Sequence, residues 1–75
     1  MNLNDRHFLE QLGFRIRELR LARGLTQADL AESCGLHRTF IGSVERGERN
    51  VAVLNLRRIA KTLRVPIEDL FVDDK

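Results

Sequence analysis

The sequence has little of what stabilises or equips many small proteins. It contains one cysteine and one proline in 75 residues, and neither tryptophan nor tyrosine. A single cysteine forms no intrachain disulfide, and no cysteine and histidine cluster has the spacing of a metal site. No run of about 18 apolar residues could cross a membrane, and the first residues lack the pattern of a signal peptide. We therefore expect a cytoplasmic protein without a bound metal.

The residue sets of common enzymes are also missing. There is no Ser/His/Asp set, no metal-ligand spacing and no phosphate-binding glycine loop. The length allows one small domain, here residues 1–75, which excludes the paired domains of most cofactor enzymes. We expect a protein that is not an enzyme and needs no cofactor or small-molecule ligand. A domain of this size buries only about 60% of its unfolded surface, so a second subunit would add stability.

Charge is divided unevenly along the chain. Residues 1–64 carry 12 basic and 7 acidic side chains, whereas residues 65–75 carry 1 basic and 4 acidic side chains. Of the 13 basic residues 11 are arginine, whose planar guanidinium suits phosphates and guanine edges. A basic body with an acidic tail indicates a polyanionic partner, although arginines on solvated helix faces would give the same composition.

Apolar residues recur at helical spacing, which predicts five short helices and no strands. The first helix would be capped by Asn4 and stop at Gly24, with Arg20 and Arg23 solvated near its end. Its buried stripe would be Leu9, Leu12, Ile16 and Leu19. A fourth helix over about 53–63 would bury Val53, Leu56, Ile59, Ala60 and Leu63. Pro66 would open a fifth helix over 67–71. The fold class expected is all-α, a compact five-helix bundle.

Residues 26–46 have the features of a helix-turn-helix. Thr26 can form a capping box with Asp29 at the start of a short helix. Gly35 supplies a turn with positive φ, and a third helix follows over about 37–46. Ala31 is small enough for this helix to approach the preceding one closely. The core shared by both helices would be Leu30, Leu36, Ile41 and Val44. Two short helices joined by a tight turn with glycine are typical of this motif.

These segments resemble the phage-repressor/Cro-like (XRE-type) helix-turn-helix family. The matching segments are 25–31, the turn at Gly35, 41–47 and 63–71. Within the family, residues 37–41 followed by 45–50 are similar to the controller proteins of bacterial restriction–modification systems. The resemblance covers about residues 14–71 and implies a five-helix, DNA-binding, homodimeric transcription regulator. The sequence departs from the family pattern at Ala52, where a capping residue is usual, at Pro66, and at Gly42 in the recognition helix.

The DNA contacts expected from this arrangement fall into two groups. Arg38 and Thr39 would lie on the first turn of the third helix, which points at base edges, with Ser43 one turn further on. Arg38 can grip O6 and N7 of guanine, and Thr39 can touch a thymine methyl. Contacts to the DNA backbone would come from Arg17, Thr26, Gln27, His37, Phe40, Arg46, Arg49 and Asn50.

Some of these residues have a structural alternative. Arg38 could be a phosphate clamp that reads no base, and Phe40 could belong to the core. Arg46 could pair with Glu45 or Glu48 instead of a phosphate.

A homodimer is expected because one recognition helix reads too few base pairs to select an operator from a genome. Its interface would use the apolar residues left over from the core, Val51, Leu54, Phe71 and Val72. We therefore expect a transcription regulator that binds double-stranded DNA at a palindromic operator. The alternative is an antitoxin-type module of the same fold, which binds a toxin protein and represses its own operon.

The basic body predicts DNA binding that depends strongly on salt. With about six phosphate contacts per dimer, the logarithm of the binding constant should fall against the logarithm of salt concentration with a slope near −5 or steeper. A titration of duplex DNA at several salt concentrations measures this slope, and a slope close to zero would contradict DNA binding.

Overall fold

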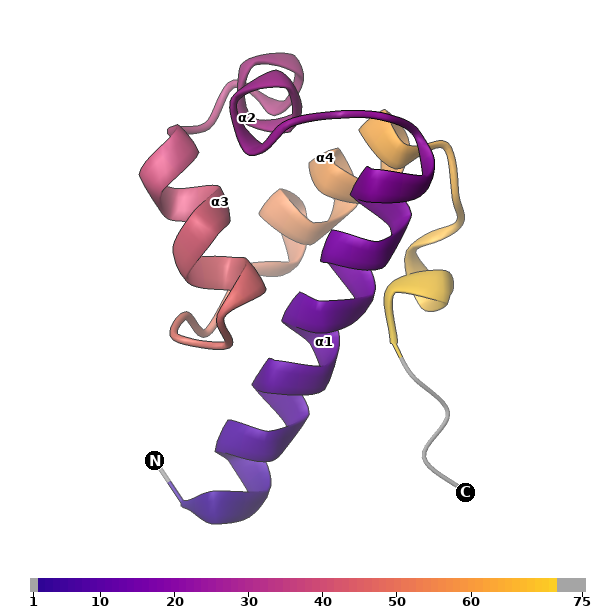
Figure 1. Ribbon diagram of the computed structural model, residues 1–75. Coiled ribbons are helices and arrows are strands. Elements are labelled where there is room, and N and C mark those ends of the chain that lie inside the picture. Colours follow the sequence, from indigo (N-terminus) through magenta and orange to yellow (C-terminus); the bar gives the residue numbers. More distant parts are fainter. Residues whose placement is uncertain (1, 72–75) are drawn as a thin grey trace.

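The computed structural model describes residues 2–71, and every regular element among them is helical (Figure 1). The elements are α1 (Leu3–Ala22), α2 (Gln27–Cys34), α3 (Arg38–Glu45), α4 (Val53–Leu63) and a short 3-10 turn, η1 (Ile67–Leu70). The all-α class is confirmed, but five helices is a wrong count. After Pro66 the backbone bonds join residues three apart: Asp69 N donates to the Pro66 carbonyl and Phe71 N donates to the Glu68 carbonyl. These bonds define a single 3-10 turn.

Helix α1 is longer than its neighbours and starts earlier than expected. Asn2, not Asn4, is its N-cap, and the Asn2 side chain accepts a hydrogen bond from Asp5 N at 2.8 Å. The helix ends before Gly24, whose φ of 70° lets the chain turn toward α2. Its 20 residues make a rod about 30 Å long. The first turns of this rod project beyond the other helices (Figure 1).

All four helices and η1 contribute to the core: α3 packs on α1 and α2, α4 packs on α2, and η1 packs on α1 and α4. The largest fully buried side chains are Ile16, Leu30, Ile41, Val44, Ile59, Leu63 and Leu70. The predicted apolar stripes therefore face the core, with one exception. Val53 is 67% exposed, because it is the first residue of α4 and the buried face of that helix begins only at Leu56.

Cys34 is a small buried residue. Its thiol lies 3.5 Å from the hydroxyl of Thr62, so it joins α2 to α4. Burial raises the pKa of the Cys34 thiol above its ordinary value, because the apolar surroundings disfavour the thiolate.

Helix α1 packs directly against the backbone of α3 at a glycine. A Cβ atom on Gly13 would lie 2.3 Å from the carbonyl oxygen of Val44, so α1 can approach this closely only without a side chain. The contact continues at Gly47, where a Cβ atom would lie 2.7 Å from the Cα of Glu10. The C-terminal end of the recognition helix is thereby fixed on α1.

We expect Gly13→Ala and Gly42→Ala to shift stability in opposite directions. The new methyl at position 13 would strike backbone that cannot yield, so the free energy of unfolding should fall by at least about 2 kcal/mol. At position 42 the nearest atom is the flexible end of Arg46, at 3.2 Å. There the better helix propensity of alanine should add up to about 1 kcal/mol. Urea unfolding measures both, and an unchanged free energy of unfolding for Gly13→Ala would show that α1 has room to shift.

Candidate DNA-binding interface

The start of α2 is held by a capping box. The Thr26 hydroxyl accepts a hydrogen bond from Asp29 N at 3.0 Å, and the Asp29 carboxylate accepts one from Thr26 N at 2.9 Å. The bond from Thr26 N holds the pKa of Asp29 below its ordinary value. The expected box is confirmed, and it places Gln27 at the first helical position, where free backbone N–H groups favour an anion.

The turn between α2 and α3 is the one that the sequence predicts. Gly35 adopts a left-handed conformation with φ 70° and ψ 31°, and Leu36 N donates to the Ala31 carbonyl at 2.9 Å. His37 is the N-cap of α3 and makes no side-chain capping bond. Arg38 and Thr39 follow as the first two residues of α3, and both are exposed. The structure therefore presents this pair to solvent at the start of the recognition helix.

Ser43 differs from the expectation that it faces the DNA groove. Only 7% of the residue is exposed, and its hydroxyl donates to the Phe40 carbonyl at 2.7 Å. The same hydroxyl accepts a hydrogen bond from Arg49 Nε at 3.1 Å. Burial and these two bonds turn Ser43 toward the loop after α3, where it orients Arg49 and does not present its hydroxyl to a base.

Arg49 is held from two sides. Besides its bond to Ser43, its guanidinium carbon lies 5.6 Å from the centre of the Phe40 ring, within reach of a cation–π interaction. Phe40 is half-buried and packs against the core, so it belongs to the core and also supports Arg49. The terminal nitrogens of Arg49 are bound to neither residue.

The remaining predicted residues are more dispersed. Arg46 donates through Nε to the carboxylate of Glu48 at 3.1 Å, so its partner is Glu48 and not Glu45. This bond raises the pKa of Arg46 and lowers that of Glu48. Arg17 is exposed on α1 and forms no hydrogen bond or ion pair with the described part of the chain. Asn50 lines a groove beside α1 together with Asp5, Phe8 and Leu9.

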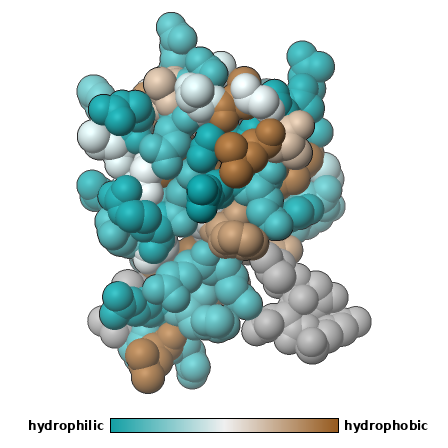
Figure 2. Space-filling view, in the orientation of Figure 1, coloured by the Kyte–Doolittle hydropathy of each residue, from teal (hydrophilic) through white to brown (hydrophobic). Residues whose placement is uncertain are grey.

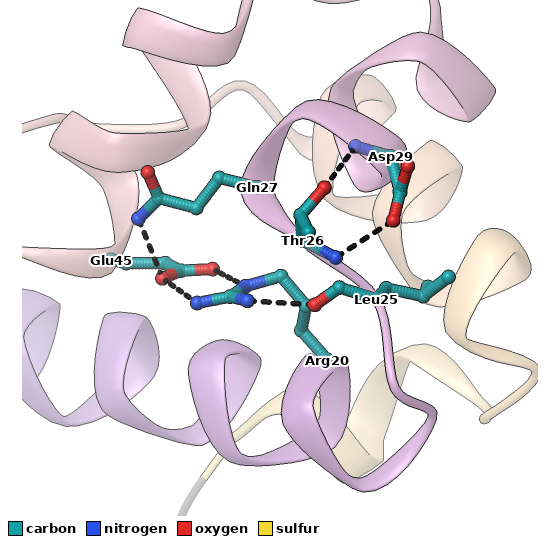
Figure 3. A network of polar contacts seen from close by, with 6 residues as sticks. All are labelled: Arg20, Leu25, Thr26, Gln27, Asp29 and Glu45. Atoms are coloured by element: carbon teal, nitrogen blue, oxygen red, sulfur yellow. Dashed lines mark hydrogen bonds and ion pairs between the residues drawn. The ribbon is translucent and has the colours of Figure 1, made fainter.

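A buried polar network was missed at the sequence level (Figure 3). Arg20 was expected to be solvated, but its side chain is 8% exposed and pairs with Glu45, whose side chain is 3% exposed. Arg20 donates through Nε to one Glu45 oxygen at 2.7 Å and through Nη2 to the other at 3.0 Å. Its Nη1 donates to the Leu25 carbonyl at 2.8 Å. The prediction for Arg20 is therefore wrong.

This network joins the two helices of the motif. The side-chain nitrogen of Gln27 donates to Glu45 at 3.0 Å, so the carboxylate at the end of α3 also holds the first residue of α2 (Figure 3). The hydrogen bond to Glu45 raises the pKa of Arg20, which stays charged at any relevant pH. One sequence feature could have revealed the pair: Arg20 follows Ile16, and Glu45 follows Ile41, each by one helical turn on a buried face.

The residues predicted for a dimer interface lie in the loop before α4, on α4 and directly after η1. Leu54 is 62% exposed on α4, and Val51 is half-buried against the core. Phe71 is 40% exposed, and its ring stacks on Phe8 of α1 with centroids 6.0 Å apart. Val72 lies outside the described residues.

Within residues 2–71 no helix is long and apolar enough to span a membrane.

Comparisons with known proteins agree with this geometry. The model of a helix-turn-helix family matches residues 16–70. The chain is 44% identical to control protein C.BamHI of Bacillus amyloliquefaciens, over 77% of this chain and 73% of that protein. It is 48% identical to control protein C.SmaI of Serratia marcescens, over 81% and 73%. The crystal structure of the restriction–modification controller protein C.AhdI from Aeromonas hydrophila superimposes with a TM-score of 0.83 and 46% identity, covering 84% of this chain and 96% of that one.

Removing one partner of the buried ion pair should destabilise the fold strongly. Arg20→Met or Glu45→Leu leaves one buried charge unpaired, and each should lower the free energy of unfolding by about 3–5 kcal/mol. The double variant buries no charge and should recover most of that loss. Urea unfolding of the four proteins measures the coupling between the two sites. Losses that simply add in the double variant would show that the pair contributes no coupling.

Proposed function

Because the chain belongs to the helix-turn-helix family of DNA-binding transcription regulators, we propose that it is a restriction–modification controller protein. In this proposal it binds a palindromic operator as a homodimer. The similarity to C.BamHI, C.SmaI and C.AhdI over most of the chain supports the controller assignment. The chain is a regulator and not an enzyme. The antitoxin alternative has no support among these relatives.

The observation that carries the proposal is the exposed pair Arg38 and Thr39 at the start of α3. In the docking mode of this motif, the first turn of the second helix meets base edges in the major groove. An arginine there binds guanine through O6 and N7, and the threonine methyl packs on thymine. Base reading by these two residues accounts for sequence specificity without Ser43, whose hydroxyl is used inside the protein.

Contacts to phosphate surround this pair. At the start of α2, free backbone N–H groups can donate to a phosphate. The side-chain nitrogen of Gln27 can donate as well, because Glu45 accepts only one of its two hydrogens. Arg49 is held by Phe40 and Ser43 before DNA arrives, so less side-chain entropy is lost on binding. Arg46 must exchange Glu48 for a phosphate, and this costs little because the pair is exposed to solvent.

A homodimer would bind an operator with two half-sites, one for each recognition helix. If Leu54 and Phe71 of two copies meet on a two-fold axis, the recognition helices enter successive major grooves about 34 Å apart. Selection from a library of random duplexes should therefore enrich an inverted repeat. Enrichment of a single half-site, or of no sequence at all, would contradict this proposal.

We expect Arg38→Ala and Gln27→Ala to differ in how they affect specificity. On the selected duplex, Arg38→Ala should weaken binding by about 1–3 kcal/mol and relax discrimination at one base pair of each half-site. Gln27→Ala should weaken binding to the selected and to a scrambled duplex by the same factor, because its contact is to phosphate. Fluorescence anisotropy with both duplexes measures this. An equal loss on both duplexes for Arg38→Ala would make Arg38 a phosphate clamp.

A further inference from the structure

The first turns of α1 lie outside the part of the chain that the family model matches, which begins at residue 16. They project from the body of the fold, and one of the hydrophobic patches in Figure 2 lies at their end. We propose that residues 3–9 form a dimerisation arm, and that a groove beside it receives the start of α4 from a second copy of this chain. The inference rests on the homodimer of the proposed function and names the surface that Leu54 meets on the second copy.

The arm is fixed at its base. Arg15 Nε donates to the carbonyl of Asp69 at 3.0 Å, and the ring of Phe8 stacks on Phe71. The arm therefore extends from the body in a defined direction, held against the segment that carries the predicted interface residue Phe71. This continuity places the arm beside the dimer face and not beside the DNA-contacting turn of α3.

A groove runs between the arm and the loop that precedes α4. It has a volume of about 530 Å³ and is lined by Asp5, Phe8, Leu9 and Asn50. Half of Phe8 remains exposed in spite of its stack on Phe71. The groove thus combines an apolar wall with one carboxylate, and Asp5 forms no ion pair with any residue of 2–71.

The start of α4 has the complementary chemistry. Its exposed face carries Leu54 together with Arg57, Arg58 and Lys61. These three cations form no ion pair within the described chain, and two such faces meeting directly would repel each other. Placed in the groove of a second copy, Leu54 covers Phe8 and Leu9 while Arg57 meets Asp5.

Phe14 provides a matched control for Phe8. It lies on the same helix and is similarly exposed, at 57% against 51%. It shares its surroundings with His7 and Glu10, on a face of α1 that does not touch the groove.

Sedimentation velocity of the full chain at micromolar concentrations tests the arm. Phe8→Ala should raise the dimer dissociation constant about tenfold or more, whereas Phe14→Ala should change it by less than about twofold. Circular dichroism confirms folding, which should persist because Phe8 lies outside the core. Equal effects of the two variants would overturn the inference.

Charge reversal gives an independent measurement. Asp5→Arg and Arg57→Asp should each raise the dissociation constant, and the double variant should restore it to within about threefold of the wild type. Additive losses in the double variant would overturn the pairing. Leu54→Glu separates the arm from the homodimer itself. If Leu54→Glu is monomeric while Phe8→Ala still dimerises normally, the arm fails and the proposed function stands. If the wild-type chain is monomeric at every concentration tested, both the arm and the proposed homodimer are contradicted.

Discussion

The buried ion pair between Arg20 and Glu45 is the interaction on which the placement of α1, α2 and α3 depends. Two charges removed from water stabilise a fold only when nearly all their hydrogen-bonding capacity is used, and here Leu25 and Gln27 complete the set. A shift of any one helix by an ångström would break several short bonds at once. The pair therefore selects one relative arrangement of the three helices, whatever its net contribution to stability.

That arrangement matters because DNA recognition depends on where α3 stands relative to the start of α2. Glu45 lies at the end of the recognition helix and binds the residue that begins its partner helix. At the same end of α3, Gly13 allows α1 to touch the backbone of Val44 and Glu45. Helix α3 is thus held at its C-terminal end, while Arg38 and Thr39 of its first turn, which we propose to read bases, remain exposed. In the loop after α3, Arg49 is restrained in the same way by Phe40 and Ser43.

The sequence predicted what is determined locally. The capping box of Thr26 and Asp29, the left-handed Gly35 and the apolar stripes all follow from spacing within one or two turns. The errors concern contacts that lie outside a regular helical pattern. Arg20 looked solvated because its partner is 25 positions away. Ser43 looked exposed although its partners are near in sequence, because the position of Arg49 depends on the path of the loop after α3. Two further errors lie at helix ends, where the spacing of apolar residues gives the least information. The N-cap of α1 is Asn2 and not Asn4, and Val53 at the start of α4 is exposed. The 3-10 turn η1, which stands where a fifth helix was predicted, is an error of the same kind.

The close approach at Gly13 also limits how the chain can change over evolutionary time. Every other amino acid carries a Cβ atom, so any nucleotide change that replaces this glycine gives a residue that does not fit the space beside Val44. Descendants of this protein should therefore vary at the exposed start of α3, at Arg38 and Thr39, while the crossing of α1 and α3 is inherited unaltered.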